Sequence, residues 1–419
     1  MTNLNAAAPS PPSSMPFSYK LGLLAILYLA QGVPFGFFTQ ALPVVMRQQG
    51  YALTWIGLSS LLALPWALKW LWAPLLDARY LRRLGRRRTW LLTLQVTTAI
   101  LMLTLAWFGQ RGAIVWLLVG SFVTNLLAAS QDIATDGLAV ELLSTKERGA
   151  GNGIQVAAYR LGMIFGGGAL LVVFDRVGWG AALVAMAAVS IAALVPVVVY
   201  REPAAAVPPT RIESPWALLK LPSVSRWCAV LLLYKVGDAM ASGMVRPYLV
   251  DSGLGLSEIG TLVGTVGSGA GLVGALIGGV LTAHLGSRRA LFAFGALNAC
   301  ALSSYAALAH GWLTQSWVPL AIALEHIAGG MATVALFTCM MQWCRPGHEG
   351  SDYTLQASLV VVSTGLAHAL GGVSAHQFGY AAHFSVASLA TLAAALLTWW
   401  VFPRLRAAGL AQTEHREAR

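Results

Sequence analysis

The sequence predicts an all-α membrane protein with twelve transmembrane helices, arranged as two halves of six. Three observations predict this fold class: apolar stretches recur along the whole chain, charged residues are scarce, and a pattern from the first half returns in the second. Hydrophobic residues make up 57% of the 419 positions and charged residues 10%, whereas soluble domains contain about 25% charged residues. The bilayer is therefore the expected solvent, and a set of soluble domains is excluded.

The first half is predicted at residues 19–199, after a polar N-terminal tail at 1–18. The tail lacks a basic start followed by an apolar run, so we expect a disordered segment and no signal peptide. Each apolar stretch has the roughly 20 residues that a helix needs to cross the hydrocarbon core. The helices of this half are predicted at about 19–41, 52–76, 90–108, 113–140, 150–174 and 179–199.

The second half is predicted at residues 225–403, between a proline-rich cytoplasmic linker at 200–224 and a cytoplasmic tail at 404–419. Its helices are predicted at about 226–250, 257–283, 290–310, 317–343, 353–375 and 383–402. The helix at 257–283 is rich in glycine, with several glycines four residues apart, which lets helix backbones approach closely. Static packing and a sliding contact between the halves both explain this pattern.

A repeat supports the two halves, because five residues of the first half return in the second at a constant offset of 203. They are Gly50, Leu53, Thr54, Ile56 and Gly57, matched by Gly253, Leu256, Ser257, Ile259 and Gly260. Further on, Gly149 and Gln155 match Gly350 and Gln356. Two like halves joined by a linker form the parallel repeat of the major facilitator fold, in which a site near the bilayer midplane is exposed alternately to each side.

Basic residues predict the orientation. Six arginines lie between Arg79 and Arg88, in one short loop. With both termini in the cytoplasm, inner loops and tails hold 20 of the 27 Lys and Arg, and outer loops hold only Arg47, Arg111 and Arg176. This asymmetry is typical of a multi-pass protein of the bacterial inner membrane. It also explains the net charge of +11 without a nucleic-acid partner.

The sequence favours a transporter over a membrane-embedded enzyme or a sensor. The short loops contain no Ser/His/Asp spacing, no metal-ligand spacing and no Walker-type phosphate loop. The four cysteines form no CxxC pair, so neither a disulfide framework nor a zinc site is predicted. We therefore expect no catalytic residues, no metal and no cofactor.

Acidic residues within the apolar stretches are the candidates for proton coupling, because an ionisable side chain at the centre of a membrane helix costs about 2.5–3.5 kcal/mol. Asp132 and Asp136 are four residues apart and share one face of the fourth helix. Two carboxylates this close titrate as a coupled pair, which suits a proton relay. A structural ion pair with Lys69 or Arg160 is the alternative.

The second half supplies two further proton-coupling candidates, Asp238 and Glu325. Glu325 precedes His326, so these two residues form a possible second titrating couple. Lys235 and Asp238 are three residues apart and can neutralise each other. Tyr234, four residues before Asp238, is expected on the same helix face.

Cationic and polar residues within the spans are the candidates for substrate binding. Their positive charge would suit a carboxylate or another anionic group of the substrate. The candidates on this basis are Lys69, Gln131, Arg160, Tyr234, Lys235 and Arg246.

Charges at the predicted cytoplasmic helix ends are candidates for gating. Asp77 stands at the end of the second helix, before the arginine-rich loop that contains Arg86. A carboxylate beside fixed cations can act as a latch between helix ends. Lys146, Glu147 and Arg148 in the next inner loop are possible partners, and topology-setting charge is the simpler explanation for most of the arginines.

Several of these residues belong to motifs that resemble one known group, the AmpG-like permeases. The first half carries most of the resemblance, in the segments Lys69 to Asp77, Gly85 to Arg88, Ser130 to Asp136, Glu147 to Ala150 and Tyr159 to Met163. The second half matches mainly at Asp352 to Leu355. Within the resembling segments, Tyr159 is a further candidate for substrate binding.

The opening segment, from Tyr28 and Gln31 to Pro43, is more similar to the RhtX/FptX-type siderophore importers. These two residues complete the substrate-binding candidates. The chain is also too short for the two additional helices usual in AmpG-type permeases. The resemblance therefore implies proton-coupled import of a ferric siderophore, with anhydromuropeptide import as the alternative. The expected partners are this small-molecule cargo, protons and the lipid bilayer, and the chain is expected to be a monomer.

Overall fold

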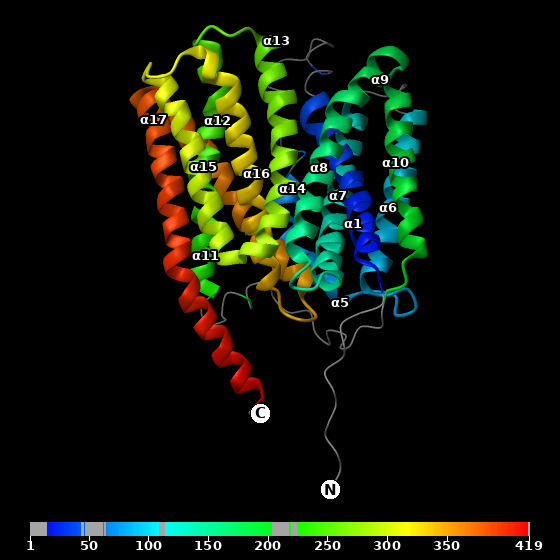
Figure 1. Ribbon diagram of the computed structural model, residues 1–419. Helices are drawn as coiled ribbons and strands as arrows, with labels where there is room; N and C mark the ends of the chain where they lie inside the picture. The colour runs from blue at the N-terminus through cyan, green and yellow to red at the C-terminus, as the bar shows by residue number, and fades with distance from the viewer. Residues whose placement is uncertain are drawn as a thin grey trace. The chain divides into compact units, whose positions relative to one another are not determined.

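The computed structural model describes residues 15–42, 46, 62, 64–108, 114–202, 218 and 224–417. All regular structure in these residues is helical (Figure 1). Among them, nine helices are long and apolar enough to cross a membrane. The count of twelve stays a prediction, because the first copy of the repeat, at 50–57, and most of the linker lie outside the described residues.

The described helices form two compact units. Unit 1 contains Met1–Glu147, Leu161–Glu213 and Cys344–Ser351, and unit 2 contains Arg148–Arg160, Ser214–Trp343 and Asp352–Arg419. Each unit therefore includes one short segment from the other predicted half. These two segments carry Gly149 and Gly350, which correspond in the sequence repeat. The predicted halves and termini themselves remain untested.

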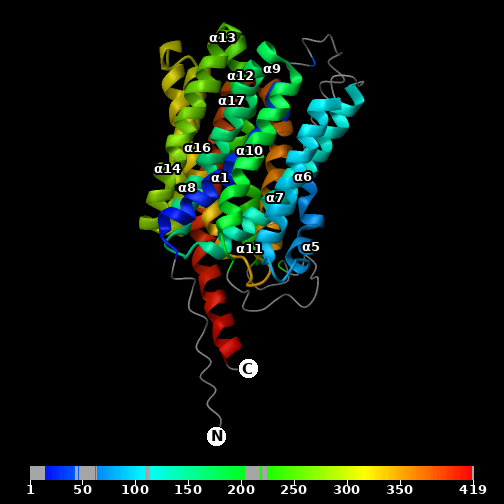
Figure 2. The same ribbon diagram turned by 90° about the vertical axis from the view of Figure 1, so that its right-hand side faces the viewer.

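Unit 1 begins with α1 (Phe17–Gly36), which contains Pro34 and continues into a π-helical turn, η1 (Phe37–Ala41). Proline cannot donate the helical hydrogen bond, so a local change of winding next to it is expected. The other elements are α4 (Leu64–Leu68), η3 (Lys69–Leu71), α5 (Ala73–Ala78), α6 (Arg86–Phe108), α7 (Ile114–Leu142), η5 (Phe165–Ala169), α9 (Leu170–Val177) and α10 (Trp179–Val199). In both views, α6 lies beside α7 (Figures 1 and 2).

The helix α8 (Arg148–Ile164) contributes to both units, since its residues up to Arg160 belong to unit 2. Its last turn packs directly on α1 in unit 1. A Cβ atom on Gly162 would overlap the backbone of α1 at Leu29 and Gly32. Glycine is therefore required there for the close approach of the two helices.

Unit 2 contains α11 (Val224–Leu233) and α12 (Val236–Asp251), separated by a turn at Tyr234 and Lys235. The other elements are α13 (Leu256–Ile259), η7 (Gly260–Gly267), α14 (Ser268–Leu285), α15 (Ser287–Ala309), η8 (Gln315–Trp317), α16 (Val318–Gln342) and α17 (Glu349–Glu417). Gly379, with a φ of 76°, breaks α17, so its two arms correspond to the last two predicted helices. The part of α17 after Gly379 extends to Glu417, beyond the predicted end at 402.

The third predicted helix begins earlier than expected. Its start was predicted at residue 90, but α6 starts at Arg86, so Arg86, Arg87 and Arg88 lie in its first turn and not in a loop. The reason is a cap from a distant residue. The Glu202 carboxylate accepts hydrogen bonds of 2.8 to 3.1 Å from the backbone N–H groups of these three arginines, which otherwise lack helical partners.

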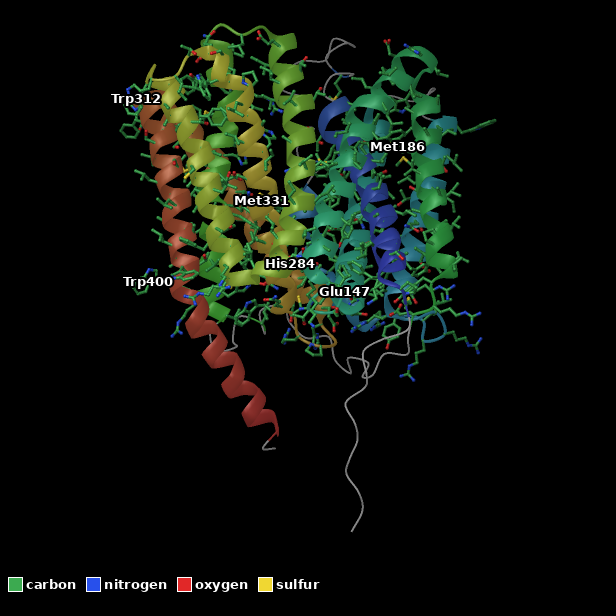
Figure 3. All side chains as sticks on the ribbon, viewed as in Figure 1. Glu147, Met186, His284, Trp312, Met331 and Trp400 are labelled. Carbon is green, nitrogen blue, oxygen red and sulfur yellow. The ribbon has the colours of Figure 1, made fainter. Side chains whose placement is uncertain are left out.

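Two exposed tryptophans lie near opposite ends of unit 2 (Figure 3). Trp312, between α15 and α16, is 76% exposed, and Trp400 on α17 is 68% exposed. Tryptophan is enriched where membrane proteins meet the two bilayer interfaces. The exposed leucines and valines of the intervening helices fit a lipid-facing surface.

Candidate functional site

A buried charge cluster in unit 1 brings Lys69 together with Asp132 and Asp136. The ammonium group of Lys69 forms an ion pair with Asp132 and lies 3.8 Å from Oδ2 of Asp136. All three side chains are buried. Of the two structural partners considered for the carboxylates, Lys69 is therefore the one in contact with them. With both carboxylates ionised, this cluster has a formal charge of −1.

Local structure explains how Lys69 reaches α7. It lies in η3, a 3₁₀ turn that interrupts the helical segment between α4 and α5. A short 3₁₀ stretch within a membrane helix often marks a hinge or a functional position. The indole of Trp66 lies beside the ammonium, with the nitrogen 5.7 Å from the ring centroid, within the range of a cation–π contact.

Polar residues of α1 support the carboxylates. The Tyr28 hydroxyl donates a hydrogen bond of 2.8 Å to Oδ1 of Asp136. Gln31 donates one of 2.6 Å to the hydroxyl of Thr135, next to Asp136 on α7. Tyr28 and Gln31, predicted from the resemblance alone, are thus adjacent to the predicted acidic pair. Gln131 is also buried on α7.

A second cluster lies within unit 2. Lys235 forms an ion pair of 2.6 Å with Asp238, as their spacing predicts, and Asn298 donates a hydrogen bond of 2.8 Å to the same carboxylate. Glu325 lies 2.5 Å from Nδ1 of His326. The predicted couples in the second half are therefore real contacts.

Arg160 completes this second cluster. Its guanidinium attracts the carboxylates of Glu325 and Asp238 electrostatically, but no ion pair or hydrogen bond of Arg160 occurs among the described residues. With Lys235 and Arg160 against Asp238 and Glu325, the formal charge is zero when His326 is neutral.

The remaining candidates are Tyr234, Arg246 and Tyr159. The Tyr234 hydroxyl donates to the backbone carbonyl of Leu291 at 2.8 Å, so it is not directed at Asp238. The turn after α11 interrupts the helical periodicity on which the shared face depended. Arg246 is exposed and makes no ion pair within the described part of unit 2, and Tyr159 is partly buried on α8.

A third cluster lies at the end of α5, in unit 1. Nη1 of Arg87 donates a hydrogen bond of 2.5 Å to Oδ1 of Asp77, and the backbone N–H of Ser351 donates one of 2.7 Å to Oδ2. Arg86 donates to Glu141 and Glu349, both at 2.8 Å. The cluster therefore holds residues 344–351 against the start of α6.

Burial by itself would raise the pKa of Asp77, but the Arg87 guanidinium and the hydrogen bonds from Ser351 lower it, and the net pKa lies below the ordinary carboxyl value. Within the described part of unit 1, the predicted partner Lys146 is not among the contacts of Asp77. Glu147 instead pairs with Lys20 at 2.9 Å and precedes α8 (Figure 3).

Among the residues that were not singled out from the sequence are Glu141, Glu202, Asn298, Glu349 and Ser351. Glu141 had one usable indication, since it follows Asp136 on the same helix as a further acid. The others come from elements far away in the sequence and have no local pattern.

The profile of the Major Facilitator Superfamily matches residues 24–324 and 230–419. The chain therefore belongs to the Major Facilitator Superfamily and is a multi-pass membrane transporter. It is 31% identical over 379 residues to the anhydromuropeptide permease of Escherichia coli K12, a match that covers 88% of this chain and 77% of the permease.

Two further relatives extend this comparison. An uncharacterized protein of Haemophilus influenzae is 28% identical over 414 residues, covering 93% of this chain and 96% of that protein. A putative transporter AmpG 4 of Rickettsia conorii is 22% identical over 365 residues, covering 81% and 86%. The predicted AmpG-like resemblance is confirmed. These relatives give no support to the siderophore-importer branch.

Solved structures of major facilitator transporters share the fold. The human organic anion transporter MFSD10 superposes with a TM-score of 0.73 at 16% identity, covering 92% of this chain and all of that one. The Escherichia coli fucose:proton symporter superposes with a TM-score of 0.67 at 11% identity, covering 92% and 99%. The predicted all-helical major facilitator fold is thereby confirmed.

Proposed function

We propose that this chain imports an anhydromuropeptide from the periplasm into the cytoplasm across the bacterial inner membrane, driven by proton entry through alternating access. The cargo class is supported by the identity to the anhydromuropeptide permease over 88% of this chain. Proton coupling is supported by the unit 1 cluster, in which two carboxylates share one ammonium group.

The charge of this cluster suggests how a proton acts. A net charge of −1 in a buried site is unfavourable, and uptake of one proton by Asp132 or Asp136 makes the cluster neutral. The same proton weakens the attraction of the carboxylates to Lys69. Because Lys69 lies on the η3–α5 segment and the carboxylates on α7, protonation loosens a tie between two helices. This change is the proposed link between proton entry and the transport cycle.

Uptake into proteoliposomes tests this proposal. The wild type should accumulate radiolabelled anhydromuropeptide under an inward proton gradient, about tenfold for each proton and pH unit. Asp132→Asn and Asp136→Asn should abolish gradient-driven accumulation but retain exchange of internal for external cargo. Asp251→Asn is the matched control, because Asp251 is exposed and, within the described part of the chain, its carboxylate accepts a hydrogen bond from Tyr380 alone. Full accumulation by both cluster variants would refute the coupling role.

Ferric siderophore, the cargo that the opening segment of the sequence favoured, is tested as a second cargo in the same uptake assay. The relatives favour the muropeptide, so we expect labelled ferric siderophore to remain at the level of empty liposomes. Siderophore accumulation without muropeptide accumulation would reverse the assignment of the cargo.

The contacts of Asp77 support a gating role for the cluster at the end of α5. Asp77, Arg86 and Arg87 hold residues 344–351, which the sequence places between the tenth and eleventh helices. Release of this segment is the proposed step that opens one side. Glu147 and Arg148 remain candidates for the same process through the start of α8.

A further inference from the structure

The glycines of η7 and α14 fall into three groups by what a Cβ atom would meet. At Gly274 and Gly278 it would overlap the backbone of α16, at Ile327 and Met331. Figure 3 shows Met331 on α16 beside α14. These two glycines allow helix packing. At Gly269 a Cβ atom would meet nothing within 4 Å.

Gly267 and Gly271 form the third group, because each faces an ionisable side chain and not a backbone. A Cβ atom on Gly267 would lie 2.6 Å from Nε2 of His326, and one on Gly271 would overlap Nη1 of Arg160. The missing side chains at these two positions therefore leave room for His326 and for Arg160. Arg160 can keep its observed position only while residue 271 has no side chain.

The Arg160 guanidinium beside Gly271 differs from the two lysines within the spans. Lys69 and Lys235 each form ion pairs, whereas Arg160 makes none among the described residues. Its planar guanidinium offers five N–H donors in a fixed arrangement. A partly buried guanidinium without an ion pair is unfavourable at membrane depth, so such residues usually mark a path or a site for a ligand.

Acceptors next to Gly329 provide a second, independent observation, and two of them, Glu325 and Asp238, interact electrostatically with Arg160. Oδ1 of Asn298 is buried and has no hydrogen-bond partner within the described structure. This oxygen would lie 3.8 Å from a Cβ atom built on Gly329. Oδ1 of Asp238 and Oε1 of Glu325 would lie 3.5 and 3.9 Å from the same position. A ligand that offers an acceptor to Arg160 and an N–H or O–H donor to these oxygens would satisfy both. Peptide-like groups with a carboxylate have this chemistry.

We propose that Arg160, seated over Gly271, binds a carboxylate of the cargo, and that Gly271 is the positioning residue that aims the guanidinium. The inference rests on the proposed function and specifies the chemical group that unit 2 recognises. Guanidinium and carboxylate form paired, charge-assisted hydrogen bonds with a fixed geometry. Lysine at position 160 would keep the charge but lose this geometry.

The first test compares the KM for uptake of anhydromuropeptide with free peptide carboxylates and with amidated carboxylates. The wild type should show a KM about 10- to 100-fold lower for the free form. Gly271→Ala should lose this preference but still transport the amidated form, and Gly269→Ala should keep the preference. Arg160→Lys should retain a reduced preference. Equal KM values of the wild type for both forms would overturn the proposal while leaving the cargo assignment intact.

A second test does not depend on the cargo. Citrate, a small carboxylate probe, should raise the thermal unfolding midpoint of the purified wild type and of Gly269→Ala at constant ionic strength, but not that of Gly271→Ala. If muropeptide uptake is absent and this pattern holds, the carboxylate site stands and the cargo assignment fails. If citrate stabilises Gly271→Ala as much as the wild type, or stabilises neither, the carboxylate site is refuted.

Discussion

The two clusters within the apolar helices pair their lysines in opposite ways. In unit 1, Lys69 reaches from η3 to α7 and serves two carboxylates. In unit 2, Lys235 pairs with Asp238 three residues further along the same chain segment. The first arrangement connects two helices and has a formal charge of −1 when both carboxylates are ionised, whereas the carboxylate of the second is neutralised by its neighbour on the same segment. This difference is the basis of the two proposals, a proton response in unit 1 and a ligand at Arg160 in unit 2.

A shared feature sharpens this contrast. Both lysines lie where a membrane helix is interrupted, Lys69 in the 3₁₀ turn of η3 and Lys235 in the turn between α11 and α12. Such interruptions free backbone groups, which are tolerated at membrane depth only where protein or a polar cavity satisfies them. The two units therefore have similar breaks in a helix but pair the lysine at the break with different numbers of carboxylates.

The largest expected effect comes from removing the two lysines separately. Lys69→Met removes the ammonium group that the two buried carboxylates share and should lower the free energy of unfolding by about 3–5 kcal/mol at neutral pH. Lys235→Met should cost less, because its pair is more exposed, at 13% against 5% for the Lys69 side chain, and Asn298 still bonds Asp238. Unfolding by SDS titration in mixed micelles measures both.

A double variant that restores the formal charge of the unit 1 cluster is the control for the comparison of the two lysine variants. Lys69→Met combined with Asp132→Asn returns the unit 1 cluster to −1 and should recover much of the lost stability. Equal losses for the two lysine variants, or no recovery in the double variant, would show that the clusters do not differ as described.

An intermediate effect is expected from removing one neutral donor from each cluster. Tyr28→Phe removes the hydrogen bond to Asp136, and Asn298→Leu removes the one to Asp238. Each hydrogen bond to a charged group contributes about 1.5–3 kcal/mol. Tyr28→Phe should fall nearer the upper end, because its acceptor belongs to the cluster with excess negative charge. The same SDS titration measures the order, and the reverse order would contradict the charge assignment of the clusters.

Spacing within one helix was sufficient to predict part of these sites. Asp132 and Asp136 share a helix face because α7 is continuous, and the contact between Lys235 and Asp238 follows from their separation of three. Tyr234 failed for the complementary reason, since the chain turns between Tyr234 and Val236 and the periodicity does not continue across a turn.

Partners that are distant in sequence were not predictable. Ser351 and Glu349 reach the α5–α6 end from more than 260 positions away, and no local pattern reports such a contact. The early start of α6 has the same origin, because its first turn is capped by Glu202. The fold followed from composition and repeat, whereas long-range hydrogen bonds required the structure.

The smallest stability effect is expected at the α5 end, where the charge is shared most widely. Asp77→Asn leaves Arg87 neutralised by Glu141 at 2.6 Å and Glu349 at 3.5 Å, so the loss should be about 1–2 kcal/mol, less than that of an isolated buried pair.

The stability contribution of Asp77 should depend on pH with a defined sign. Because the pKa of Asp77 lies below its ordinary 3.8, its contribution is present above that pH and is lost as the pH falls through the lowered value. The difference in free energy of unfolding between wild type and Asp77→Asn should therefore be constant from pH 7 to about 4 and shrink below pH 4.

If Asp77 also gates, the variant should bind cargo with unchanged affinity while its transport rate falls. Lost binding in a folded variant would assign Asp77 to the cargo site instead.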